Sequence, residues 1–120
     1  MTKKSIFKAA RVSNPDVSGW LKNHAVIVHD GLIKAVEPSE NINAAEDSHE
    51  VYDLGNVSLL PGLVDAHCHM HCSATWDARA LALGENNQQL TIRATNNMRK
   101  AVLAGTTTIR DIGSKNEVAF

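Results

Sequence analysis

Two stretches decide the fold: residues 60–69, LPGLVDAHCH, and residues 105–111, GTTTIRD. Each opens on a glycine turn signal and continues into apolar or β-branched residues, which predicts a strand. Between them, residues 86–104 carry a helical face, at three- and four-residue steps, made of Leu90, Arg93, Ala94, Asn97, Met98, Ala101 and Val102. A strand, a crossover helix and a second strand form a βαβ unit, so we expect the two strands to be parallel.

The sequence before residue 55 has a different pattern, typical of a small antiparallel sheet. The predicted strands are residues 5–12, 25–29, 32–36 and 51–54. Asp30-Gly31 separates the second from the third strand and favours a type I′ hairpin turn, because both residues tolerate a positive φ. Residues 37–50 are polar and acidic, which predicts a loop.

The composition is that of an ordinary globular protein. The chain has 120 residues, 43% hydrophobic and 21% charged, with a formal net charge of -1. This balance argues against nucleic-acid binding and against attraction to an anionic membrane. No run approaches a signal-peptide core or the roughly 18 apolar residues of a membrane span, so we expect a cytoplasmic protein with reduced cysteines.

The segment around His67 and His69 carries the candidate chemistry. Side chains alternate along a strand, so His67 and His69 should project to one face with Asp65 below them. Cys68 and Met70 should face the covering helix. Two neutral imidazoles at positions i and i+2 can converge on one metal ion. The alternative is a solvent-exposed, histidine-rich loop without a ligand role.

Residues 60–69 and 105–111 resemble the first two barrel strands of the amidohydrolase superfamily, and the second stretch is most similar to the imidazolonepropionase-related and prolidase-like branch. The resemblance implies an α/β fold: the N-terminal part of a small β-sandwich (residues 1–58), then the first βαβ unit of a (β/α)8 TIM barrel (residues 59–120). A whole barrel needs about 200 residues or more. We therefore expect this chain to be the N-terminal portion of a larger enzyme, with an incomplete barrel.

The resemblance also implies a metal-dependent hydrolase that cleaves carbon–nitrogen bonds through a metal-activated water, with one or two divalent metal ions, most often zinc. His67 and His69 match the metal ligands, and Asp65 matches the acidic residue below them. Arg110 and Asp111 end the second strand, where an indirect role such as a structural ion pair is expected. The catalytic acid–base group is expected beyond Phe120, so the 120-residue chain should be inactive by itself.

Other residues near His67 and His69 have two possible roles. His71 and Trp76 follow the first barrel strand and could line a pocket, and packing or a loop position is the alternative. His24, His29 and His49 lack a partner at ligand spacing and are expected to be solvated or partly packed.

The expected partner is a small-molecule or dipeptide-like substrate, with no nucleic acid and no membrane, and a homo-oligomer stays open. Two other functions also stay open. One is a small metal-binding module using the histidines and cysteines of residues 67–72. The other is a non-catalytic remnant that binds a partner through unpaired strand edges.

Overall fold

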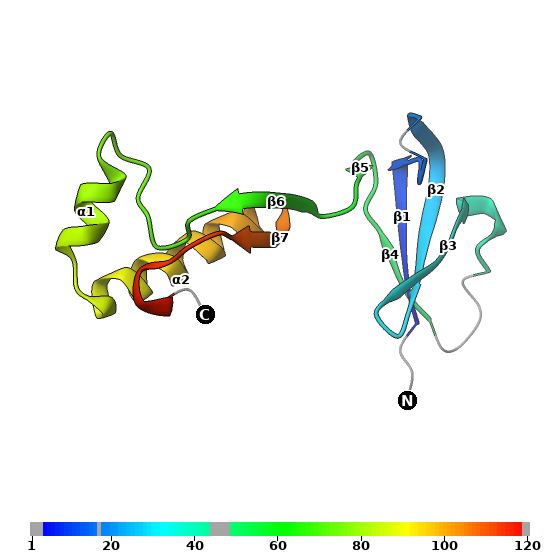
Figure 1. Ribbon diagram of the computed structural model, residues 1–120. Coiled ribbons are helices and arrows are strands. Elements are labelled where there is room, and N and C mark those ends of the chain that lie inside the picture. The colour runs from blue at the N-terminus through cyan, green and yellow to red at the C-terminus, as the bar shows by residue number, and fades with distance from the viewer. Residues whose placement is uncertain (1–3, 17, 44–48, 119–120) are drawn as a thin grey trace. The chain divides into compact units, whose positions relative to one another are not determined.

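The computed structural model describes residues 4–16, 18–43 and 49–118. The chain divides into two compact units, residues 1–61 and 62–120, each with its own sheet (Figure 1). Neither helix in the described part of the chain is long and apolar enough to cross a membrane.

The first unit is one sheet with the strand order β3-β2-β1-β4, and β5 also pairs with β1. Its elements are β1 (Lys4–Ser13), β2 (Trp20–His29), β3 (Leu32–Pro38), the 3₁₀ turn η1 (Ser39–Asn41), β4 (His49–Asp53) and β5 (Ser58–Leu59). The predicted hairpin is confirmed: β2 and β3 are antiparallel, and Asp30 and Gly31 between them have φ values of 53° and 73°.

The prediction of an antiparallel sheet before residue 55 is wrong for β4, the last strand that it included. Both β4 and β5 pair with β1 in parallel, with Lys4 opposite His49 and Arg11 opposite Ser58. The chain crosses from one edge of the sheet to the other after β3, and only such a crossover makes a parallel pair. The predicted loop is also shorter than residues 37–50, because β3 continues to Pro38 and β4 begins at His49. Residues 44–48 of that loop lie outside the described part.

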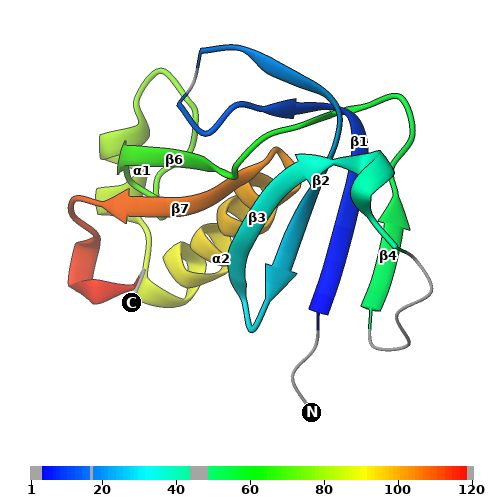
Figure 2. The same ribbon diagram turned by 90° about the vertical axis from the view of Figure 1, so that its right-hand side faces the viewer.

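The second unit contains the predicted βαβ arrangement. Its elements are β6 (Leu63–Cys68), α1 (Ala78–Gly84), α2 (Asn87–Leu103), β7 (Thr106–Asp111) and the 3₁₀ turn η2 (Lys115–Glu117). Strands β6 and β7 are parallel neighbours from Leu63 opposite Thr106 to Cys68 opposite Asp111, and α2 connects them (Figure 2). The expectation of a parallel pair is therefore confirmed.

Helix α2 begins and ends as its sequence predicts. A capping box joins Asn86 and Gln89 at its start, and Gly105 follows its end with a φ of 98°. Leu90 and Ala94 on its inner face are fully buried. Ala94 packs against Cys68 and Met70, so this helix covers the face of β6 that lies opposite the histidines.

Helix α1 was not expected, because its residues read as part of a loop. Asp77 caps its first turn by accepting the N–H of Ala80 at 3.0 Å. The ammonium group of Lys115 donates to the carbonyls of Leu83 at 3.0 Å and Glu85 at 2.8 Å, at the other end. A seven-residue helix is too short to be stable alone. It forms here because a lysine far along the chain binds its free carbonyls.

Gly62 explains why a glycine precedes β6. A Cβ atom at this position would lie 1.9 Å from the Thr107 Oγ1 atom and 2.7 Å from the Thr107 Cβ atom. Rotation of the threonine side chain cannot relieve the second contact, since it leaves Cβ in place. The close approach of β6 and β7 at the start of the parallel pair therefore requires glycine.

We expect Gly62→Ala to lower the free energy of unfolding by about 1–3 kcal/mol, because the added methyl group forces the start of β6 away from β7. Urea titration followed by circular dichroism measures the loss. Gly84→Ala is the control, since a Cβ atom there meets nothing within 4 Å. An equal stability of the Gly62→Ala chain and the parent would contradict this packing argument.

Candidate metal centre

His67 and His69 lie at the carboxyl end of β6, and the structure brings their rings together. Both side chains are exposed, and their ring centroids are 5.8 Å apart in an edge-to-face arrangement. The ring of His71 continues the row, 6.1 Å from that of His69. The strand alternation thus places two imidazoles where one ion could contact both.

The hydrogen bonding of His69 defines which of its nitrogens is available. Its Nδ1 atom donates to the carbonyl oxygen of Gly113 at 2.8 Å. A carbonyl only accepts, so Nδ1 carries the proton and Nε2 keeps its lone pair. His69 can therefore act as a ligand through Nε2, with the second-shell hydrogen bond that metal-bound histidines usually make.

The cysteines do not join the histidine pair. The Cys68 side chain is buried against α2, and its thiol donates to the Arg110 carbonyl at 3.4 Å. Burial raises the pKa of Cys68, and the carboxylates of Asp111 and Asp65 raise it further. Burial likewise raises the pKa of Cys72, whose Sγ atom lies 3.6 Å from His71 Nε2. Without a metal, both thiols are therefore protonated at neutral pH.

Two imidazoles do not complete a metal site. Within residues 4–16, 18–43 and 49–118, no group of three or more histidine, cysteine or acidic side chains is placed to hold a metal ion. A catalytic zinc ion takes three protein ligands and a structural one takes four.

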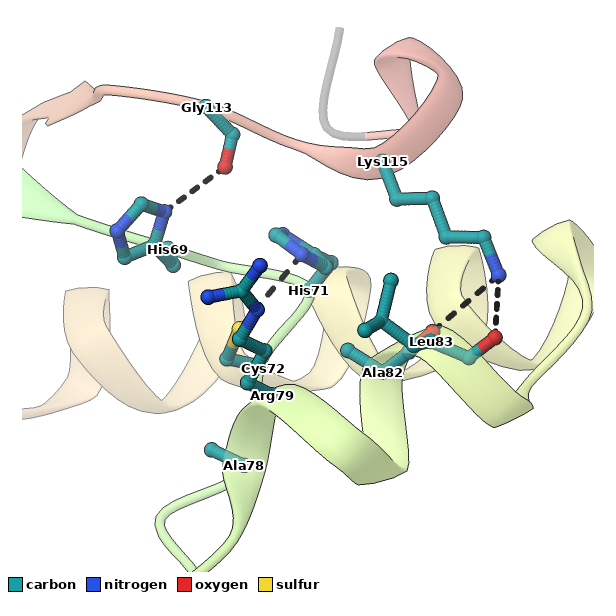
Figure 3. A pocket seen from close by; sticks show the side chains of 9 residues that line it. All are labelled: His69, His71, Cys72, Ala78, Arg79, Ala82, Leu83, Gly113 and Lys115. Atoms are coloured by element: carbon teal, nitrogen blue, oxygen red, sulfur yellow. Dashed lines mark hydrogen bonds between the residues drawn. The ribbon is translucent and has the colours of Figure 1, made fainter.

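A pocket of about 420 Å³ lies beside the histidines, with α1 as one wall (Figure 3). His69, His71, Arg79 and Lys115 are among its lining residues. His71 is only 7% exposed, and its Nδ1 atom has no hydrogen-bond partner among the described residues. Trp76, the other candidate lining residue, is 98% exposed and does not line this pocket, because it lies in the turn just before α1.

The chain that follows His69 is anchored from two sides. The N–H of Met70 donates to Asp111 Oδ2 at 2.9 Å. The Asn97 amide, on α2, donates to the carbonyls of Met70 and Cys72, both at 2.8 Å. Sequence reasoning missed this role for Asn97, although a polar residue on a mostly apolar helix face is the signal that could have found it.

The other residues that were expected to act indirectly are Asp65, Arg110 and Asp111. Asp65 is exposed, and its Oδ1 atom accepts the N–H of His67 at 3.1 Å. Arg110 is exposed, and within the described part of the chain it forms no ion pair with Asp111. Asp111 accepts hydrogen bonds from the main-chain N–H groups of Met70 and Gly113, and an indirect role for Arg110 and Asp111 stays a prediction.

A second polar pair joins the start of α2 to the loop after α1. The carboxylate of Glu85 accepts two hydrogen bonds from the Arg93 guanidinium, and Arg93 also reaches the His71 carbonyl at 3.5 Å. These hydrogen bonds lower the pKa of Glu85 and raise that of Arg93. The pair therefore links one wall of the pocket to the segment that carries His71.

Comparison with known proteins gives a consistent result. Residues 58–120 match the profile of the Amidohydrolase family. The chain is 34% identical over 84 residues to an imidazolonepropionase from Chromobacterium violaceum. This match covers 62% of this chain and 20% of that protein. It is 43% identical over 49 residues to a 5-methylthioadenosine/S-adenosylhomocysteine deaminase from Nitratidesulfovibrio vulgaris, covering 41% of this chain and 11% of that protein.

Solved structures show the same fold over nearly the whole chain. A Xaa-Pro dipeptidase with bound methionine superposes with a TM-score of 0.80 at 21% identity, covering 97% of this chain and 28% of that one. A prolidase gives a TM-score of 0.77 at 19% identity, covering 92% of this chain and 26% of that one. The chain thus spans only a minor part of each relative's length.

The Glu85–Arg93 pair predicts an acid-sensitive contribution to stability. Its folded-state carboxyl pKa lies below the unfolded value, so the contribution is present above about pH 4.3 and is lost as the pH falls through the lower folded value. Glu85→Gln should melt below the parent at pH 7, and the difference should shrink on acidification. Differential scanning calorimetry at stepped pH measures this, with Glu40→Gln as the control. A difference that is independent of pH would contradict the assignment.

Proposed function

The chain belongs to the amidohydrolase family, and on that premise we propose that His67 and His69 are the first metal ligands of a metal-dependent hydrolase that cleaves carbon–nitrogen bonds. The observation that carries the proposal is the imidazole pair at the carboxyl end of β6, with ring centroids 5.8 Å apart. Enzymes built on parallel α/β barrels form their active sites at this end of the strands.

The donor set fits a divalent cation of the zinc type. Neutral imidazole nitrogen is a preferred ligand of zinc, and the hydrogen bond from His69 Nδ1 to Gly113 leaves Nε2 free for it. A bound divalent cation would supply a Lewis acid that polarises the scissile carbonyl and activates water. Asp65 steadies the main chain of His67 through the hydrogen bond to its N–H. The protein's contribution at this point is to hold two ligands in a fixed orientation.

The substrate class follows from the relatives, and we propose a small molecule or a dipeptide-like compound. The matched proteins are named as an imidazolonepropionase, a deaminase and a Xaa-Pro dipeptidase. A choice among these depends on the loops that follow the later strands of such barrels. The full activity is a proposal for a protein of the relatives' length, since this chain covers 20% of the first of them.

Zinc binding to the 120-residue chain tests the ligand assignment. We expect His67→Ala and His69→Ala each to weaken Zn²⁺ binding at least tenfold in isothermal titration calorimetry, because each removes one of two imidazoles. His24→Ala is the matched control: its Nδ1 atom also donates to a main-chain carbonyl, that of Lys22, at 2.7 Å. An affinity unchanged by both substitutions, or reduced equally by His24→Ala, would reject the assignment.

We also expect the zinc-loaded 120-residue chain to show no turnover of dipeptides or cyclic amides, because two protein ligands are one fewer than a catalytic zinc site uses. Product formation followed by chromatography is the measurement. Zinc-dependent hydrolysis that disappears in the His69→Ala chain would show that the pair suffices and would overturn this expectation.

A further inference from the structure

We propose that Asp111 is a positioning residue for His69, acting through the main chain of Gly113 to fix which ring nitrogen faces the metal. The inference rests on the proposed function, in which His69 is a metal ligand. It adds a carboxylate at the end of β7, that of Asp111, which supports the ligand His69 indirectly.

The first step is the contact between His69 and Gly113. The imidazole Nδ1 donates to the Gly113 carbonyl at 2.8 Å, which selects the tautomer that bears its proton on Nδ1. The orientation of the Gly113 peptide therefore decides whether Nε2 is left as the free, metal-facing nitrogen.

The second step is that Asp111 forms hydrogen bonds to the main chain on both sides of this contact. Its Oδ1 atom accepts the N–H of Gly113 at 3.0 Å, and its Oδ2 atom accepts the N–H of Met70 at 2.9 Å. One carboxylate thus holds the residue that follows His69 and the residue whose carbonyl accepts its hydrogen bond. Both oxygens are used as acceptors, and an asparagine side chain has only one such oxygen.

The third step is the position of this carboxylate relative to the sheet. The pairing of β6 with β7 ends at Cys68 opposite Asp111, followed by a last main-chain hydrogen bond from Ile112 to Cys68 at 3.2 Å. His69 and Gly113 lie beyond that point, where no strand pairing holds them. Asp111 continues the connection between the segments that follow β6 and β7 past the end of the sheet.

The chain contains an internal comparison for this role. Asp53 in the other unit makes the same local hydrogen bond, because its Oδ1 atom accepts the N–H of Gly55 at 2.9 Å. Both aspartates end a strand and are followed two residues later by a glycine. Asp53→Asn therefore tests the loss of the turn carboxylate alone, without a link to His69.

The test is imidazole ¹⁵N NMR of the metal-free 120-residue chain at alkaline pH, for the parent, Asp111→Asn and Asp53→Asn. We expect the Nδ1–H tautomer at His69 in the parent and in Asp53→Asn. In Asp111→Asn, the ratio of the two tautomers should shift several-fold toward Nε2–H. The same variant should bind Zn²⁺ about tenfold more weakly than the parent, as second-shell substitutions do.

Three results would overturn the proposal. One is an Nε2–H tautomer at His69 in the parent chain. Another is an Asp111→Asn chain that keeps the parent tautomer ratio and zinc affinity while its melting temperature falls. The third is an Asp111→Asn chain that does not fold, since the carboxylate would then serve stability. Failure of the metal-ligand assignment is a separate result: His69→Ala would leave zinc affinity unchanged whatever the tautomer spectra show.

Discussion

The parallel pairing of β6 with β7 is the constraint on which the second unit depends. Because the strands run in the same direction, their carboxyl ends lie side by side, and residues 42 or 44 positions apart in the chain become neighbours. The pairing requires a crossover, which α2 provides, and a close approach at its start, which Gly62 permits. Without the parallel direction, His69 would have no contact with the end of β7.

The two ends of the β6–β7 pair are held by different interactions. At the start, the chains are held by close packing against a glycine, where there is no room for a side chain. At the finish, polar groups replace strand pairing: Asp111 and Asn97 bind the main chain on either side of Met70, while the Met70 side chain is buried under α2. The unit therefore presents His69 from a segment beyond the strand pairing, which side chains of β7 and α2 hold through its main-chain groups.

The sequence predicted the βαβ unit, the hairpin and the pairing of the histidine rings, because each depends on local signals: periodicity, capping residues and strand alternation. Features that depend on distant residues were missed. Strand β4 has no local mark of its direction, and α1 forms with the help of Lys115, some thirty residues away. The position of Asn97 on the helix face is visible in sequence, whereas the carbonyls that it binds are not. An indirect role was expected for Asp111, but the main-chain N–H groups that it binds, those of Met70 and Gly113, are not visible in sequence.

Lys115 holds the end of α1, one wall of the pocket, through main-chain carbonyls. The position of this wall therefore does not depend on the side chains through which it contacts a ligand. The ammonium group contacts main-chain carbonyls of Ala82, Leu83 and Glu85, and every residue type supplies the same carbonyl. The side chain at position 83, which is 62% exposed, can therefore be exchanged for others without loss of the bond that holds the helix in place. A wall supported in this way can change its affinity for apolar or polar groups through single substitutions, while the histidines beside it keep their geometry.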